Sequence, residues 1–495
     1  MLQLVGAEPP EADGLTRLEE QVRLDLEYLG LPAADWGAPA KHHKGHPVHD
    51  VIIIGAGMNG LAVAASLLLK GISNIRVLES NREGQEGPWL TFARMDTLRS
   101  PKELPGLSLG IPSLSFRSWY EACYGPDAWE QLYKIPNADW VSYLTWFRKQ
   151  MSIPVKHGVS VTEVDLEDDV VRVTGKIPGG PEIVFHARRV VLATGRGGAG
   201  GNHIPGFIDE GLWPHLAAHT NEEIDFRRLE GQSIAVIGGG ASGWDNAATA
   251  LEAGAERVDM YIRRPFLPQV NKGRGSTNPG YHLGWQALSD AERWNLMAYM
   301  DDVQGPVPHE TVKRALAQPG FHIHLGTPVE QVAGEGGQVL VYLGGEKPAV
   351  RTHDFLIVGT GFRIDIAAVD ALHKLQADIA RWEDVYQPPP GLIRPHLAGF
   401  PYLGPGFELQ ERVPGKNPDI SRIHMLNHGA ALSHGSIASD IPGVGIAAER
   451  AATAIVAHLF REDSLHHLEA LRHYNEPELI DTPFYVADIN DLSSS

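Results

Sequence analysis

Cysteine is almost missing from this sequence, since Cys123 is the single thiol among 495 residues. One cysteine excludes an intrachain disulfide and any Cys-x-x-Cys pair, so the chain has no dithiol redox centre. This composition suits a reducing compartment, and we expect a cytoplasmic protein. We also expect no metal site, because no cysteine or carboxylate cluster accompanies the histidines of "HHKGHPVH", residues 42–49, which are interpreted as a solvated linker.

Positive charge is scarce as well. The chain has 42 Lys and Arg residues against 61 Asp and Glu residues, a formal net charge of −19. Nucleic-acid phosphates would be repelled by such a surface, so we expect no nucleic-acid partner. A local basic patch could still bind a small anion.

Long apolar runs and a secretory signal are not found either. No run of about 18 apolar residues stands out, and "MLQLVGAEPPEADG" has neither a basic start nor a sustained apolar core. We therefore expect no membrane span and a globular protein with two or more core-bearing domains. Near the start, the spacing of Leu15, Leu18, Val22, Leu26 and Leu29 predicts a helix that docks on the body.

What the chain does have is two glycine-rich turns, each between a strand and a helix. The first is Gly55-x-Gly57-x-x-Gly60 in "DVIIIGAGMNGLAVAA", and "IRVLES" follows as the next strand. This context predicts a dinucleotide site: the glycines allow a tight turn and a close approach of the pyrophosphate, which meets the helix N-terminus. Glu79, about 24 residues on, can accept hydrogen bonds from ribose hydroxyls. Asn59 and Ser80 complete this candidate site.

The second turn, in "SIAVIGGGASGWDNA", has the same context but a different ending. Its candidate residues are Gly238, Gly240, Ser242 and Gly243. Where a match to Glu79 is expected stand Arg263 and Arg264, and arginine can hold a 2′-phosphate that a carboxylate would repel. The first site is therefore interpreted as binding FAD or NAD, and the second NADPH.

These two units in this order resemble the two-dinucleotide-binding flavoproteins, and among them the class B flavoprotein monooxygenases. "GGGASGWDNA" is similar to the G-x-G-N-S-G-x-D-I-A pattern of flavin-containing monooxygenases, although Ala241 replaces Asn. "EGPWL" resembles a GGxW segment and implies that Trp89 lies near the flavin. "WPHLAAHT", residues 213–220, matches the family fingerprint at His219 and Thr220 but not at Trp213 or His215. Disulfide reductases share the plan but need a cysteine pair.

The resemblance implies an α/β fold with two Rossmann-like domains for FAD and NADPH, the second inserted in the first. The expected parts are residues 1–47, a helical extension and linker; 48–196, the first part of the FAD-binding domain; 197–352, the NADPH-binding domain; and 353–495, the second part of the FAD-binding domain, with a C-terminal helix. "RVVLATGR" and "DFLIVGTGFR" mark the returns where the domains meet, with Thr194, Gly195, Thr360 and Gly361.

Further site residues follow from the resemblance. The stretch "TLRSPKELPGLSLGIPSLSF", residues 97–116, implies that Arg99 and Lys102 lie near the flavin, where a cation can stabilise reduced flavin or hold an acidic substrate. The backbone near Val161 would meet the adenine, and His219 would contact the nicotinamide ribose. "LSHGSIASD", residues 432–440, resembles a segment of ornithine and lysine N-hydroxylases and implies that Asp440 lies beside the flavin.

The activity implied is NADPH-dependent oxygenation, in which a C4a-(hydro)peroxyflavin transfers one oxygen atom from O2 to a small molecule. N-hydroxylation of an amine or amino acid is slightly preferred. The open alternatives are hydroxylation of a heterocycle such as urate, S-oxidation or Baeyer–Villiger oxidation, a non-oxygenating NAD(P)H–flavin oxidoreductase, and a non-catalytic nucleotide-binding protein. A homo-oligomer is compatible with the sequence.

Overall fold

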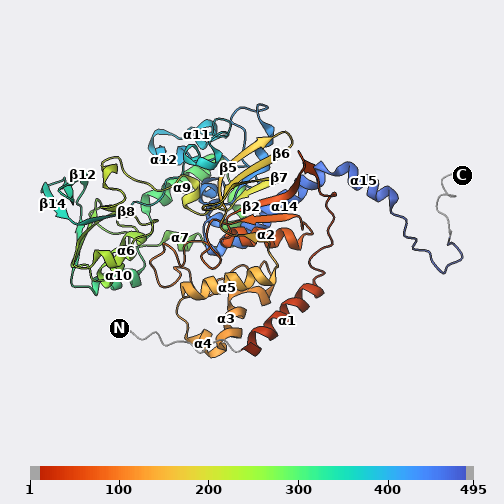
Figure 1. Ribbon diagram of the computed structural model, residues 1–495, viewed down its shortest axis with the longest axis horizontal. Coiled ribbons are helices and arrows are strands. Elements are labelled where there is room, and N and C mark those ends of the chain that lie inside the picture. The colour runs from red at the N-terminus through yellow and green to blue at the C-terminus, as the bar shows by residue number, and fades with distance from the viewer. Residues whose placement is uncertain (1–11, 486–495) are drawn as a thin grey trace.

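Two parallel sheets lie side by side in the computed structural model, which describes residues 12–485 (Figure 1). The sheet at the centre of Figure 1 belongs to the first nucleotide unit and has the order β4-β3-β2-β7-β6-β5. In addition, β1 pairs with β2 and β16 pairs with β7. Its strands are β1 His42–His43, β2 His46–Ile54, β3 Ile75–Leu78, β4 Val155–Lys156, β5 Ser160–Glu167, β6 Val170–Lys176, β7 Glu182–Leu192 and β16 Ile423–Met425.

The centre of this sheet is parallel because β2 is followed by a crossover helix that returns the chain to β3. Strands β2, β3, β4, β7 and β16 pair in parallel, whereas β5 and β6 add an antiparallel edge to β7. In β2 the residues from Asp50 to Ile54 are all buried, as a strand covered on both faces requires. The helices associated with this unit are α1 Ala12–Tyr28, α2 Met58–Leu69, α3 Phe116–Tyr124, α4 Pro126–Gln131, α5 Asn137–Gln150, α14 Val444–Glu462 and α15 Ser464–His473.

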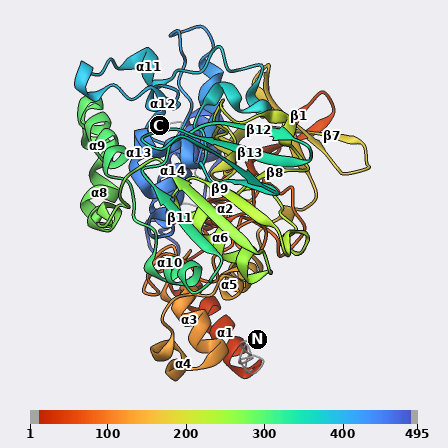
Figure 2. The same cartoon turned by 90° about the vertical axis from the view of Figure 1, so that its left-hand side faces the viewer.

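The second unit has a smaller, wholly parallel sheet of order β11-β10-β9-β15-β8 and a three-stranded antiparallel sheet, β12-β13-β14 (Figure 2). Its strands are β8 Ala217–His219, β9 Ser233–Ile237, β10 Arg257–Ile262, β11 Phe321–Leu325, β12 Val329–Glu335, β13 Gln338–Leu343, β14 Ala349–His353 and β15 Phe355–Val358. The remaining helices are α6 Ala241–Glu252, α7 Lys272–Gly275, α8 Pro279–Gly284, α9 Asp290–Val303, α10 His309–Leu316, α11 Trp382–Val385, α12 Pro395–Ala398 and α13 Ala431–His434.

The boundary expected at 352/353 does not match the pairing of β15. That strand lies beyond the boundary, yet it is hydrogen-bonded between β9 and β8 in the second sheet. The similar segments "VVLATG" and "FLIVGTG" therefore do not both belong to the first unit. The first contains the end of β7 in the first sheet, and the second contains β15 in the second sheet. The chain re-enters the first unit after Val358, not before it.

The N-terminal segment departs from the expectation in two details. Helix α1 packs on the body through Leu15, Leu18, Val22 and Leu26, whereas Leu29 lies past the helix end and is 59% exposed. The histidine-rich stretch predicted as a solvated linker forms strand β1 and the start of β2 instead.

One helical stretch of the described chain, Ile441–Glu462, is long and apolar enough to cross a membrane, where none was expected. Its mean hydropathy is 1.2, and 44% of the apolar window is buried inside the molecule. Helix α14, which makes up most of the stretch, packs on α2 and buries a stripe of small and branched side chains. The core helix of a folded domain gives this combination of length and hydropathy.

Candidate nucleotide and substrate site

The first glycine turn joins β2 to α2. Gly55 has φ +102°, and a Cβ there would lie 2.5 Å from the carbonyl oxygen of Ala193, which follows β7. A Cβ on Gly60 would lie 1.9 Å from the Gly55 carbonyl oxygen. Gly57 is the N-cap of α2 and has open space where a Cβ would stand. The turn therefore leaves the first N–H groups of α2 accessible to a pyrophosphate.

Polar side chains complete this turn. Glu79 is 5% exposed, and its carboxylate accepts hydrogen bonds from the backbone N–H groups of Ala56 and Asn81, both at 2.8 Å. The exposed Ser80 also donates to it, at 3.2 Å. The Asn59 amide donates to the carbonyl of Ala438 at 2.7 Å, while its buried oxygen has no partner among the described residues.

The second turn, between β9 and α6, repeats this backbone. Gly238 has φ +110°, and a Cβ there would lie 2.3 Å from the carbonyl oxygen of Gly359, which follows β15. Gly240 is the N-cap of α6, again with open space, and a Cβ on Gly243 would lie 2.7 Å from the Gly238 carbonyl oxygen. Ser242, in the first turn of α6, is exposed. Each turn is thus closed by the return strand of its own sheet.

The hydrogen-bond register corrects the match made between Glu79 and the arginine pair. Gly55 donates to the carbonyl of Leu78, and Gly238 donates to that of Tyr261, so the residue equivalent to Glu79 is Ile262. The Ile262 side chain packs against Gly239, at the place where Glu79 binds the backbone of the first turn. Arg263 stands one residue later, beside Arg264. Neither arginine makes an ion pair within residues 12–485, so both guanidinium groups are available to a phosphate.

Two return segments and His219 meet between the units. Thr194 accepts a hydrogen bond from the Asn427 amide at 3.0 Å, and Gly195 has φ +68°. Thr360 donates to the carbonyl of His203, whose N–H donates to the carbonyl of Gly361 at 2.9 Å.

His219 ends β8 and is completely buried, with its ring 6.0 Å from that of Phe362. Burial lowers its pKa, although nearby Glu222 opposes the shift. Its Nδ1 accepts from the backbone N–H of Asn221, and its Nε2 has no partner among the described residues. The histidine thus lies at the linker between the units as a neutral ring.

Arg99 connects the two units directly. Its guanidinium binds the Asp245 carboxylate at 2.8 Å; the arginine side chain is 42% exposed and the aspartate side chain 3%. Asp245 lies on α6, at the aspartate of the G-x-G-x-S-G-x-D pattern. Arg314 supports the same interface through the carbonyl of Arg94 at 2.7 Å. Arg99 therefore positions α6 relative to the first unit.

Lys102, the other residue predicted beside the flavin, has a structural partner instead. Its ammonium donates to the carbonyl of Trp129 at 2.7 Å and lies 4.9 Å from the centre of that indole. Helix α4, which carries Trp129, ends two residues later, so Lys102 stabilises a helix end and an aromatic face. The role predicted for Lys102 beside the flavin stays a prediction.

Trp89 and Val161, both predicted beside the cofactor, lie in different parts of the first unit. Trp89 packs edge-on against buried Trp140, with ring centres 6.2 Å apart, and its carbonyl accepts from Asn137. Val161 lies on β5, but the residue that meets the ribose carboxylate's segment is Val159, whose N–H donates to the carbonyl of Glu79 at 2.8 Å. The segment that begins β5 therefore lies beside Glu79, and the contact between the backbone near Val161 and adenine stays a prediction.

The sequence analysis missed Arg196, which directly follows the first Thr-Gly return. Arg196 lies 3.8 Å from Asp440, and the two side chains are 54% and 50% exposed. Nevertheless, burial lowers the pKa of Arg196 and raises that of Asp440. Each side chain is thus half exposed and partly desolvated by the groups around it.

Other titratable groups surround this pair. Arg99 further lowers the pKa of Arg196. His428 has its pKa lowered to about 3 by burial and then by Arg196, and its Nδ1 has no partner in the described part of the chain. Asp440 precedes α14, whose N-terminus has a positive dipole end. The site therefore combines two arginines, a neutral histidine and a carboxylate from four separate segments. The signal that could have identified Arg196 is its place directly after "ATG".

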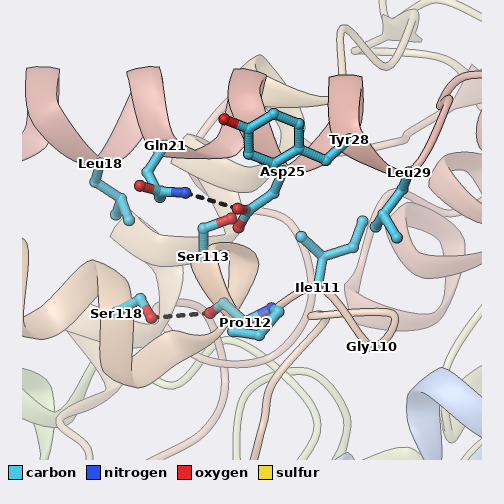
Figure 3. Close-up of a pocket in the computed structure, with 10 residues that line it drawn as sticks. All are labelled: Leu18, Gln21, Asp25, Tyr28, Leu29, Gly110, Ile111, Pro112, Ser113 and Ser118. Carbon is cyan, nitrogen blue, oxygen red and sulfur yellow. Dashed lines mark hydrogen bonds between the residues drawn. The ribbon is translucent and has the colours of Figure 1, made fainter.

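A groove of about 590 Å³ lies elsewhere, between α1 and the segment 110–118 (Figure 3). Its lining includes Leu18, Tyr28 and Ile111, with Gln21 bonded to Asp25 at 2.7 Å. No residue of either glycine turn contributes to it, so it is not the nucleotide site. The buried thiol of Cys123 also lies in this helical region, and burial raises its pKa to about 12, which makes it a poor nucleophile.

The residues present fit FAD at the first turn. The open space at Gly57, the carboxylate of Glu79 and the unpartnered oxygen of Asn59 lie where a pyrophosphate and a ribose would need them. When bound, FAD would supply hydride acceptance and oxygen activation.

Comparison with known proteins shows the family of the chain and its fold. The pyridine nucleotide-disulphide oxidoreductase family model matches residues 52–282. The chain is 37% identical over 466 residues to the FAD-dependent urate hydroxylase of Xanthomonas campestris pv. campestris, covering 94% of this chain and 97% of that protein. In fold it is similar to ornithine hydroxylase from Pseudomonas aeruginosa, with TM-score 0.64, 18% identity and coverage of 83% of this chain and 100% of that one. The L-lysine 6-monooxygenase from Pseudomonas syringae gives TM-score 0.63, 18% identity and coverage of 83% and 99%.

Proposed function

This chain belongs to the class B flavoprotein monooxygenases, and we propose that it uses FAD and NADPH to hydroxylate a urate-like heterocycle. The supporting observation is the similarity to a urate hydroxylase along 94% of the chain. The preference for N-hydroxylation is not retained, because the ornithine and lysine hydroxylases share the fold at only 18% identity.

The charges of the site support an anionic, planar substrate. Urate is an anion at neutral pH and presents several carbonyl and N–H groups. Arg196 and Arg99 supply cationic donors in a protein whose net charge is −19, and Asp440 can accept from a ring N–H.

The second turn supports NADPH as the reductant. Ile262 leaves the position of a ribose carboxylate apolar, and Arg263 and Arg264 have no ion-pair partner among the described residues. Guanidinium groups free of carboxylates can bind the 2′-phosphate in a bidentate way.

The net reaction consumes NADPH, H⁺, O2 and the heterocycle. Two electrons leave NADPH; one oxygen atom enters the substrate and the other leaves as water. The chain's own residues bind and orient the reactants. Arg196 binds the substrate anion, and Arg99 positions α6 against the first unit. The buried, neutral His219 packs at the linker between the two units. With a reducing compartment expected from its single cysteine, we place this activity in the cytoplasm.

The experiment is NADPH and O2 consumption by the FAD-loaded protein with urate, ornithine, lysine or no addition. We expect urate to accelerate NADPH oxidation at least about tenfold and to gain one ¹⁸O atom from ¹⁸O2 by mass spectrometry. Arg196→Met should raise the KM for urate while NADPH-dependent flavin reduction without substrate is retained. Equal rates with and without urate, with all oxygen recovered as hydrogen peroxide, would refute the proposal, and acceleration by ornithine or lysine alone would favour the N-hydroxylase alternative.

A further inference from the structure

A cluster of histidines and carboxylates lies at the opposite end of β2 from the first glycine turn. His43 stands opposite His46 in the β1–β2 hairpin, and His186 of β7 stands opposite Val48 of β2. The ring centres of His43 and His186 are 5.0 Å apart. Glu167 ends β5 and reaches both rings, so three segments far apart in the sequence meet here.

The distances between donor atoms match the spacing of metal ligands. His43 Nε2 lies 3.7 Å from a Glu167 oxygen, and His186 Nε2 lies 3.6 Å from the other oxygen of that carboxylate. The ligand atoms of the three residues all lie within 4.8 Å of one another. Bonds of 2.0–2.1 Å in tetrahedral geometry place zinc ligands about 3.3 Å apart. The two distances to the Glu167 carboxylate would shorten by a few tenths of an ångström, and the widest separation in the set by up to about 1.5 Å, which the side chains can supply by rotation.

Neither imidazole is fully used by the fold. The His43 and His186 side chains are 12% and 4% exposed, and His43 Nε2 and His186 Nδ1 make no hydrogen bond to the described residues. His43 Nε2 faces Glu167, and a buried imidazole nitrogen without a partner is costly unless a ligand satisfies it. His186 faces the same carboxylate through Nε2, so both rings direct a nitrogen toward the proposed ion.

The surrounding charges allow a divalent cation. Four carboxylates, Glu163, Asp165, Glu167 and Asp168, lie within ion-pair distance of three cations, Lys44, Arg172 and Lys374. Lys44 is the direct competitor because its ammonium binds Glu167, but its side chain is 61% exposed and can move into water at little cost. Arg172 keeps Glu163 at 2.6 Å if Glu167 turns to a metal.

We propose that His43, His186 and Glu167 bind a zinc ion, with Asp168 as the fourth ligand. Asp168 lies 3.7 Å from His43 Nε2, and its side chain is 70% exposed, so it can turn toward the ion. Two imidazoles and carboxylates are a donor set that zinc accepts. The ion would join the β1–β2 hairpin to β5 and β7 and so stabilise the start of the strand that leads to the first glycine turn.

The test is a competitive zinc titration against a fluorescent chelator, with tag-free, EDTA-treated, FAD-loaded protein. We expect one zinc per chain and at least tenfold weaker binding for His43→Ala and for Glu167→Gln. Lys44→Ala removes the competing cation and should bind about fivefold more tightly, the effect of one unit charge at 4 Å in water. His42→Ala, an exposed neighbour on the same strand, is the matched control and should not change the affinity.

X-ray absorption at the zinc edge then identifies the ligands, with two imidazoles expected in the wild type. His186→Ala should remove one of them; if that variant loses FAD and does not fold, His43→Ala and Glu167→Gln, at less buried positions, decide the question. Wild-type binding no tighter than that of His43→Ala, or an equal loss in His42→Ala, would overturn the proposal. Because zinc binding is measured without substrate, a negative result leaves the hydroxylase proposal standing.

Discussion

The two glycine turns share one backbone and differ in one position of the following strand. Gly55 and Gly238 have φ of +102° and +110°, and each faces the carbonyl of its own return strand at 2.5 and 2.3 Å from the place of a Cβ. After the first turn a buried Glu79 binds the backbone of Ala56; after the second, Ile262 packs on Gly239. Under the proposed function, the carboxylate of Glu79 favours ribose hydroxyls, and its absence beside Arg263 favours a 2′-phosphate. We then expect the shared backbone to bind the pyrophosphate and the side chain after the strand to select the nucleotide.

The largest effects should come from blocking each turn. Gly55→Ala places a methyl group against the Ala193 carbonyl, and we expect a colourless protein without FAD and with activity lowered at least about 100-fold. Gly238→Ala has the equivalent clash with Gly359, yet should remain yellow and lose about 100-fold in the rate of flavin reduction by NADPH. Absorbance at purification and anaerobic stopped-flow measure the two effects. Gly206→Ala, which has open space, is the control; a yellow Gly55→Ala with a colourless Gly238→Ala would reverse the assignment of the two turns.

Removing one phosphate contact should have the next largest effect. Arg263→Ala should raise the KM for NADPH about 10- to 100-fold through the loss of a charge-assisted hydrogen bond, and leave the KM for NADH unchanged. Ile262→Glu should copy the first turn and shift preference toward NADH. Steady-state kinetics with both nucleotides check this, with the exposed Arg351→Ala as control. An equal rise for NADH and NADPH would contradict a 2′-phosphate contact.

The contact between the two units can be broken without touching either turn. Arg99→Ala leaves the buried carboxylate of Asp245 without a partner, and we expect flavin reduction by NADPH to slow about tenfold because α6 is no longer positioned. Asp245→Asn keeps the shape and should cost less, and the double variant should recover part of the loss of Arg99→Ala. Stopped-flow reduction rates for the four proteins form the cycle; strictly additive effects would mean that the pair does not act as a unit.

The smallest expected effect is a loss of folding stability at low pH, caused by two buried histidines. Burial lowers the pKa of His424 and of His434 to about 3, whereas an exposed histidine titrates near 6.5. The folded state therefore binds fewer protons, so this stability is complete above pH 6.5 and is lost as pH falls toward 3. At pH 5.5 each ring should lower the free energy of unfolding by about 1.4 kcal/mol, measured by denaturant titration at several pH values. His424→Gln should flatten the pH dependence, whereas exposed His373→Gln should not change it.

The local sequence pattern was sufficient to predict the two glycine turns and the nucleotide-binding units that contain them. Residues adjacent in the sequence define the apolar strands, the spacing of the glycines and the charge after each strand. Two Rossmann-like units, and FAD in the first of them, were therefore predictable from the two turns. The arginine pair was recognised, but its register was displaced by one residue, because only the hydrogen bond from Gly238 to Tyr261 aligns Ile262 with Glu79.

Contacts between distant segments were decided by packing that no local pattern encodes. Arg99 binds Asp245, 146 residues away, and Lys102 caps α4 although both stand in the same short stretch. Strand β15 joins the second sheet because its edge pairs with β9, which its echo of β7 could not indicate. Likewise, His43, His186 and Glu167 become neighbours only when the sheet brings β1, β5 and β7 together at the end of β2 opposite the first glycine turn. Spacing along the chain determines turns and helix starts, whereas long-range side-chain pairs depend on how the sheets are assembled.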